Sequence, residues 1–445
     1  MSVTHREVEM YSSANLLSGL ADARRTTDEL FAIVRLDSLY ERPIPERHRI
    51  VFYIGHLEAF DRNLLNGRLL SLPNSTTELD RLFAFGIDPV GGGLPTDQPS
   101  DWPSLDKVRH YVQQVRDEID EGLTHLQNAN DGDFPAALLL NVAIEHRLMH
   151  AETLAYMLHR LPYDHKSAPA GAPRLSPARA RSEMVEVPAG PATLGLSRDG
   201  EIFGWDNEFE RHTVDVDGFA IDRYKTTNSE FLKFLNSGGY DNRRLWSDAD
   251  WAWKEANHIA HPAFWRRDGQ QWFWKGMFAE IPLPPDWPVY VSHAEASAYA
   301  RWAGKSLPTE AQWQRAAYGA PGGQSRRYPW GSKSPNATLG NFDFENWDPV
   351  SVAAHPAGIS AFGAEDILGN GWEWTSSVFA PFAGFEPFSF YKGYSADFFD
   401  GKHYVIKGAS PRTAACMLRP SFRNWFQPHY QYVYAGFRCV SNQLG

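Results

Sequence analysis

The sequence changes character across residues 163–182, a segment rich in Ala, Pro, Arg and Ser that carries no periodic pattern of apolar residues. Before this segment apolar residues recur at helical intervals, and after it short alternating patterns are separated by turns rich in Gly, Pro and Trp. A chain of 445 residues is also too long for a single ordinary core. We therefore expect one domain at residues 1–162, a linker at 163–182 and a second domain at 183–445.

The two halves predict different architectures. In the first half, amphipathic helices are expected at 10–40, 45–70, 104–126 and 133–161, and four helices with one long connection favour a small bundle. In the second half, short strands are expected near 185–190 and 213–219, and short helices at 228–235 and 292–303. The expected fold class is therefore an α+β multidomain protein, with a helical bundle followed by a loop-rich α+β domain.

Three histidines stand out in the helical half. His146 and His150 are spaced i and i+4, which places both imidazoles on one face of a helix, and His56 lies in a mostly apolar stretch of another. Neutral imidazoles from two packed helices could hold one side of a divalent metal ion. The alternative is that each is an ordinary buried histidine with a hydrogen bond. A zinc-protease motif is excluded, because Arg147 stands where those enzymes carry their glutamate base.

The composition of the chain limits the classes of molecule that it could bind. The net charge of −11 argues against binding to nucleic acid or to an anionic membrane. No apolar run approaches the roughly 20 residues that span a bilayer, and the first residues lack the apolar core of a signal peptide, so we expect a cytoplasmic protein. Cys416 and Cys439 are the only cysteines, too few for a disulfide framework or an all-thiolate metal site.

Several motifs resemble known families. Four of them lie in the second half, at Leu307–Trp313, Tyr328–Gly331, Asp366–Thr375 and Ala435–Arg438. Together they resemble the formylglycine-generating enzyme and its relatives, whose α+β domain is C-type-lectin-like. The first half, with its three histidines, resembles a DinB-type four-helix bundle. Their fusion in this order resembles, over nearly the whole chain, the non-heme iron sulfoxide synthases of ergothioneine biosynthesis.

This resemblance implies a reaction and a metal. In that family three bundle histidines bind Fe(II), and they fall on His56, His146 and His150. The family uses O2 to join a sulfur donor to C2 of the imidazole of hercynine, which is Nα-trimethylhistidine. Imidazole ligands suit a borderline metal such as Fe(II). The expected enzyme is therefore an oxygen-dependent non-heme iron oxidoreductase.

The resemblance also implies substrate contacts in the second domain. Asn424 and Trp425 match a segment whose Asn and Trp contact hercynine, and Tyr391 matches the first Tyr of a Tyr-x-x-Tyr-Ser segment that donates a proton. An indole face attracts a trimethylammonium group through its quadrupole. We expect Tyr391 to be the catalytic acid, although with 18 tyrosines an ordinary packed Tyr is the alternative. The remaining expected substrate-binding residues are Tyr394, Phe426 and Gln427.

Two departures from the family pattern point to a different donor. The ergothioneine enzymes carry an acidic residue after Asn-Trp, where this chain has Phe426-Gln427, and they carry arginines in the loop that here reads Gly91–Pro99 and contains none. The zwitterionic donor γ-glutamylcysteine would lose charged contacts worth about 1.5–3 kcal/mol each. We therefore favour a neutral selenosugar donor, as in the related selenoneine synthases.

Other interpretations remain open from the sequence. One is an ergothioneine-pathway enzyme that uses γ-glutamylcysteine or cysteine, and another is a non-catalytic module that binds a metal or a ligand. Formylglycine generation requires a pair of active-site cysteines, which the sequence does not place together. A structural calcium ion near Asp366–Glu373 is a further expectation, because carboxylates and carbonyls cluster there.

Overall fold

The computed structural model describes residues 13–73, 77–84, 94–129, 137–169, 183–200 and 202–441. It divides into two compact units, Met1–Ala170 and Gly171–Gly445. The division falls inside the segment predicted as the linker, and residues 170–182 of that segment lie outside the described ranges. Each unit is considered by itself.

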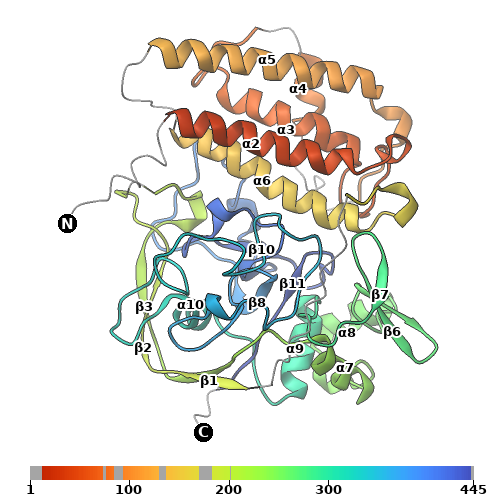
Figure 1. Cartoon of the computed structure of the whole chain (residues 1–445), viewed down its shortest axis with the longest axis vertical. Coiled ribbons are helices and arrows are strands. Elements are labelled where there is room, and N and C mark those ends of the chain that lie inside the picture. The colour runs from red at the N-terminus through yellow and green to blue at the C-terminus, as the bar shows by residue number, and fades with distance from the viewer. Residues whose placement is uncertain are drawn as a thin grey trace. The chain divides into compact units, whose positions relative to one another are not determined.

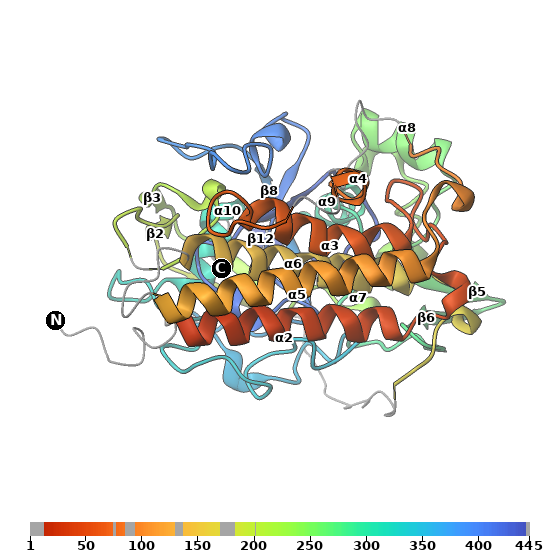
Figure 2. The same cartoon turned by 90° about the horizontal axis from the view of Figure 1, so that it is seen from above.

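The first unit is helical, with four long helices that lie alongside one another (Figure 2). These are α2 (Ser13–Ala32), α3 (Ile50–Leu65), α5 (Leu105–Ala129) and α6 (Ala137–His159). A short helix, α4 (Thr77–Leu82), lies between α3 and α5 in the sequence. Helix α2 packs against α6, and α3 packs against both α5 and α6. The predicted bundle is confirmed, although its periodicity gave no sign of α4. No helix in the described part of the chain is long and apolar enough to cross a membrane.

The helix predicted at 10–40 is too long. The chain leaves α2 after Ala32, and Val34 then forms an isolated antiparallel bridge with Lys166. The ammonium group of Lys166 is buried and donates to the carbonyl of Leu158 at 2.8 Å. These contacts attach the first residues of the predicted linker to the helical unit, which the local sequence of either segment does not reveal.

The second unit combines short strands and helices (Figure 1). Its four-stranded sheet has the order β10-β9-β8-β11, and a three-stranded sheet has the order β1-β4-β12; the other two sheets are β2-β3 and β5-β6-β7. The strands are β1 Met184–Val187, β2 Gly190–Leu194, β3 His212–Val216, β4 Phe219–Asp222, β5 Trp265–Asp268, β6 Gln271–Lys275, β7 Glu280–Pro282, β8 Gly371–Val378, β9 Tyr404–Ala409, β10 Asn424–Phe426, β11 Ala435–Gly436 and β12 Val440–Ser441.

Helices of this unit begin at sequence-encoded caps. The four helices are α7 (Asn228–Asn236), α8 (Asp248–Ala256), α9 (His293–Trp302) and α10 (Glu310–Tyr318). Thr227, Ser292 and Thr309 each accept from the backbone N–H three residues later, and the Glu or Gln there bonds back. This reciprocal capping box satisfies two otherwise unpaired donors of the first turn. The α+β class predicted for this half is confirmed.

The region proposed for calcium is filled by a lysine. The buried ammonium of Lys225 donates to the carbonyls of Asp366 and Gly369 and lies 3.2 Å from a carboxylate oxygen of Glu373. Arg438 and Trp313 also donate to Glu373, at 2.8 and 2.7 Å. Because the ammonium group of Lys225 already lies among these oxygens, the structure does not support the calcium prediction.

Replacing Lys225 tests this assignment. Lys225→Met removes the buried cation beside Asp366 and one of the two cations beside Glu373, so we expect the free energy of unfolding to fall by about 3–5 kcal/mol. The matched control is Lys305→Met, because Lys305 is partly exposed in its 2.5 Å pair with Asp222; a loss of about 1 kcal/mol is expected there. Urea denaturation measures both values. A rise in the stability of the wild-type protein on addition of Ca²⁺ would contradict the assignment.

Candidate functional site

The three predicted histidines converge in the interior of the helical unit. His56 comes from α3, whereas His146 and His150 come from successive turns of α6, and all three are at most 4% exposed. One ligand nitrogen from each lies within 4.8 Å of the others. The Nε2 atoms of His146 and His150 are 3.2 Å apart. Among the described residues, this is the one group of three or more potential ligands close enough to share a metal ion.

The donor set fits a divalent ion. With a metal–nitrogen distance of about 2.1 Å, two ligands at angles between 90° and the tetrahedral value stand about 3.0–3.4 Å apart, which includes the observed spacing of His146 and His150. The Nδ1 of His56 lies 2.7 Å from the carbonyl of Phe83. Donation to that carbonyl leaves Nε2 of His56 as the bare acceptor, and this buried atom has no hydrogen-bond partner in the described structure. A bound metal would satisfy it.

Burial keeps these imidazoles in the form that binds metals. It lowers the pKa of His56 to about 4, although the bond to the Phe83 carbonyl acts in the opposite direction. Burial, together with the neighbouring histidines, lowers the pKa of His146 and of His150 well below the usual range. All three are therefore neutral near pH 7, so a metal does not have to displace protons.

Aromatic rings hold the imidazoles in place. Phe60 stacks on His146 with ring centroids 3.4 Å apart, and Phe52 stacks on His56 at 4.8 Å. A Cβ atom at Gly55 would lie 2.5 Å from the ring of Phe83, so the absence of a side chain there lets Phe83 approach α3. The ligand group thus lies in a buried, tightly packed environment.

Arg147 holds the two ligand-bearing helices together. It is completely buried and donates to Glu58 and Asp61 of α3 at 2.9 and 2.5 Å. Burial would raise the pKa of Glu58, but Arg147 and then Arg116 lower it to about 2. The residue that stands at the position of a protease's glutamate base is therefore an interhelical tie. Sequence reasoning missed this role, for which two acidic residues in the apolar α3 were the available signal.

The structure brings together only part of the predicted substrate set. Tyr391 and Tyr394 lie with ring centroids 5.5 Å apart, and Tyr394 meets Trp425 edge-on at 5.6 Å. One face of Trp425 is stacked on Phe379 at 4.1 Å. All three predicted rings are half-buried, so they form a continuous aromatic surface that is partly open to solvent.

The other predicted residues of this set lie apart from that surface. Phe426 stacks on Tyr430 at 5.2 Å, because successive side chains of a strand point to opposite faces. The side chain of Gln427 is exposed. The side-chain oxygen of Asn424 accepts from the backbone N–H of Trp425 at 2.8 Å, which leaves the amide NH2 group to contact a ligand. Of the predicted set, Tyr391, Tyr394 and Trp425 therefore form the common ring cluster.

The strongest structural neighbour of this cluster was not predicted. Trp205 is fully buried and stacks on Tyr394 with centroids 4.0 Å apart. It comes from the connection between β2 and β3, where no motif or periodicity marks it.

The two cysteines are not joined by a disulfide. Cys416 is exposed, whereas Cys439 is buried, and burial raises the pKa of the Cys439 thiol well above the usual range.

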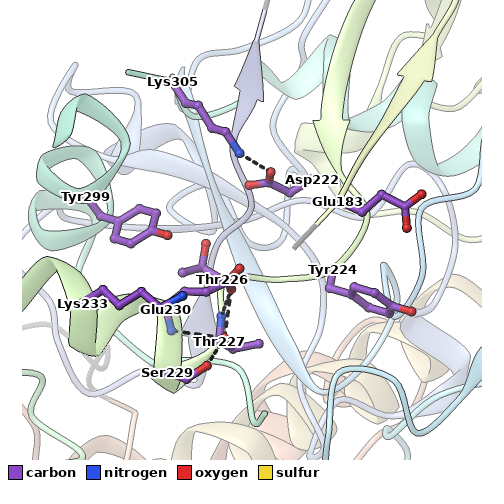
Figure 3. Close-up of a pocket in the computed structure, with 10 residues that line it drawn as sticks. All are labelled: Glu183, Asp222, Tyr224, Thr226, Thr227, Ser229, Glu230, Lys233, Tyr299 and Lys305. Atoms are coloured by element: carbon purple, nitrogen blue, oxygen red, sulfur yellow. Dashed lines mark hydrogen bonds and ion pairs between the residues drawn. The ribbon is translucent and has the colours of Figure 1, made fainter. Parts of the chain in front are cut away.

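A separate polar cavity of about 130 Å³ also lies in the second unit (Figure 3). Within it Lys305 pairs with Asp222, and Glu230 caps the start of α7 through Thr227. The full lining is Glu183, Asp222, Tyr224, Thr226, Thr227, Ser229, Glu230, Lys233, Tyr299 and Lys305. None of the predicted site residues lines this cavity, in which Asp222 is engaged with Lys305 and Glu230 with Thr227.

The lowered pKa values predict acid sensitivity of the metal-free protein. Below about pH 6.5 His56 takes up a proton in the unfolded chain but stays neutral in the folded protein. The free energy of unfolding should therefore fall as the pH drops towards 4. His56 alone accounts for about 3 kcal/mol across this range. Denaturation at several pH values should give a shallower dependence for His56→Gln than for the wild type. Equal slopes would show that His56 is not a neutral buried group.

Comparison with known proteins agrees with this two-part organisation. Residues 20–154 match the DinB superfamily and residues 170–443 match the Sulfatase-modifying factor enzyme 1-like domain. The C-terminal part is also 32% identical to the formylglycine-generating enzyme of Mus musculus, over 60% of this chain and 76% of that protein.

Two relatives span both domains. Ergothioneine biosynthesis protein 1 of Neurospora crassa is 29% identical over 91% of this chain and 55% of its own length. The hercynine oxygenase of Mycolicibacterium smegmatis is 39% identical over 377 residues, which cover 82% of this chain and 83% of the relative. The bundle with its histidine group, the second α+β unit and this similarity along most of both chains place the protein in the hercynine oxygenase family.

Proposed function

We propose that this protein is an oxygen-dependent non-heme iron enzyme that forms a carbon–chalcogen bond at C2 of the imidazole ring of hercynine. The observation that carries the proposal is the buried group of three neutral histidines, His56, His146 and His150, in a chain of the hercynine oxygenase family. The same group in a non-catalytic module would bind metal without turnover, and the experiments below distinguish the two.

The histidines would hold Fe(II). Neutral imidazoles suit this borderline ion, and three of them leave coordination positions for other molecules. A ferrous ion bound there would supply the activation of dioxygen that the reaction requires. The protein's contribution is to keep the ligands deprotonated by burial and correctly oriented by Phe83, Phe60 and Phe52.

The aromatic surface of the second unit would bind hercynine. The rings of Tyr391, Tyr394 and Trp425 are grouped and partly open to solvent. Such faces attract a quaternary ammonium ion, because the quadrupole of each ring is negative at its face. The free NH2 group of Asn424 is suited to donate to the carboxylate or to a ring nitrogen of the substrate. The hydroxyl group of Tyr391 would serve as the proton donor of the reaction.

The chalcogen donor is proposed to be a neutral selenosugar. In the segment that carries arginines in the ergothioneine enzymes, Asp97 is the charged residue, and it engages Arg42 and Arg49. The indole N–H of Trp102 also donates to Asp97, at 2.7 Å. A donor carboxylate would have to compete with Asp97 for these guanidinium groups. At the position where those enzymes carry an acid, Phe426 packs on Tyr430 and offers no charge to a donor amino group.

Turnover with matched donors tests this assignment. Protein reconstituted anaerobically with Fe(II) is exposed to O2 and hercynine, with either a selenosugar or γ-glutamylcysteine, and products are quantified by mass spectrometry. We expect kcat/KM to favour the selenosugar by at least about 100-fold, because even two missing charged contacts at about 1.5 kcal/mol each would cost the zwitterion that much. Faster product formation from γ-glutamylcysteine would refute the selenosugar and identify an ergothioneine-pathway enzyme.

The metal role is tested in the same preparation. His150→Ala should lose bound iron and turnover together, because two imidazoles remain where three are needed. His293→Ala is the matched control, since His293 is also buried, with its pKa lowered by burial to about 4, but lies in the second unit. Elemental analysis measures the iron. Stoichiometric iron with no product from any donor would favour the non-catalytic module.

The acid role of Tyr391 has its own test. Tyr391→Phe keeps the ring and removes the hydroxyl, so iron content should be unchanged while kcat falls by about 100-fold, within the range typical of general acids. Tyr430→Phe, which alters a tyrosine outside the ring cluster, is the control. Unchanged kinetics and products in Tyr391→Phe would end the acid role.

A further inference from the structure

A buried segment connects the two stretches that carry the predicted substrate contacts. Trp205 and the single 3-10 turn Asp206–Glu208 lie between β2 and β3, and every side chain in this segment is at most 1% exposed. Three of the four carry polar groups, which is costly in an interior unless those groups hold something in place. The segment is outside the residues that sequence motifs identified.

The first half of the segment holds the loop that contains Tyr391 and Tyr394. The hydroxyl of Ser395 donates to the carboxylate of Asp206 at 2.5 Å, and both residues are fully buried. Trp205 directly precedes Asp206 in the sequence, and Tyr394 directly precedes Ser395. These two rings stack with centroids 4.0 Å apart and an angle of 24° between them. A hydrogen bond and a ring stack therefore fix adjacent residues of the loop.

The second half of the segment holds the approach to β10. The carboxylate of Glu208 accepts from Arg419 at 2.8 Å and from Ser421 at 2.6 Å. The backbone carbonyl of Asn207 accepts from Arg423 at 3.3 Å. Arg423 directly precedes Asn424 and Trp425. The same four-residue segment thus contacts both sides of the aromatic surface, from a distant part of the chain.

We propose that Asp206 is a positioning residue, which holds Ser395 so that the loop presents Tyr391 and Tyr394 beside Trp425. The inference rests on the proposed function, since its kinetic consequence assumes that Tyr391 donates a proton. Glu208 fixes the other side of the surface, so a change at Asp206 moves only the loop. The contacts of this segment with the loop are the Ser395 hydroxyl bond, a backbone contact from Phe388 to Asp206 and the stacked ring of Tyr394, so loss of the hydroxyl bond should loosen the loop.

The test uses two variants that retain the shape of the interior. Asp206→Asn weakens the acceptor without changing its volume, and Ser395→Ala removes the donor. Glu295→Gln is the matched control, because Glu295 is a buried carboxylate that accepts from Ser292 at 2.7 Å in another part of the same unit. Amide hydrogen exchange read by mass spectrometry reports on the loop, and it requires no turnover. Iron-loaded protein is then assayed at saturating hercynine.

We expect exchange in the peptide that contains residues 391–395 to rise in Asp206→Asn and Ser395→Ala, and to stay at the wild-type level in Glu295→Gln. We expect kcat to fall about tenfold in both loop variants with iron content unchanged, less than the roughly 100-fold that a 1 Å misplacement of a catalytic group can cost, because the stacked ring of Trp205 remains. In the Tyr391→Phe background, Asp206→Asn should lower kcat by less than about twofold further, because residues that act through one another are not additive.

Three outcomes would overturn the proposal: exchange at 391–395 that stays at the wild-type level, kcat that stays at the wild-type level, or a full tenfold loss that persists in Tyr391→Phe. Absence of turnover in the wild type with every donor is a different result. It would refute the proposed function, while the exchange measurement would still decide whether Asp206 holds the loop.

Discussion

The ion pairs that Arg147 makes with Glu58 and Asp61 are the interaction on which the metal-binding unit depends. They join α6 to α3 in the buried interior of the bundle. Arg147 directly follows His146, and Glu58 lies two residues after His56. Because leaving any of these charges without its partner would be costly, the two helices cannot slide past one another. No further interaction is needed to bring the three imidazoles together, because the register of α3 and α6 already places them close to one another.

Much of the architecture could be predicted from local patterns. Periodicity gave the four long helices, the short helices expected at 228–235 and 292–303 correspond to α7 and α9, and the spacing of His146 and His150 gave their common face. What failed were predictions that depended on long-range partners. Nothing near Asp366 in the sequence indicates that Lys225 lies at the proposed calcium position, and nothing near Val34 indicates that it pairs with Lys166 beyond the end of α2.

The predicted substrate-binding residues show the same limit, because local sequence patterns do not reveal contacts between distant parts of the chain. Motifs grouped Trp425 with Phe426 because they are adjacent in the chain, but the alternation of a strand separates them onto opposite faces of β10. Conversely, Trp205 and Tyr394 are far apart in sequence and stack in the structure. Pairing of Asp97 with Arg42 and Arg49 could not be expected either, since the arginines belong to a different connection of the bundle. That pairing engages two arginine side chains with one carboxylate.

The contact between His56 and Phe83 uses a main-chain carbonyl. Substitution of the Phe83 side chain would therefore leave the acceptor itself intact, and the sequence around it can diverge while the imidazole keeps its tautomer. A restriction falls instead on Gly55, where a methyl group would clash with the ring of Phe83. The smallest residue of α3, which binds nothing itself, is thus constrained in size by the ring that packs beside His56.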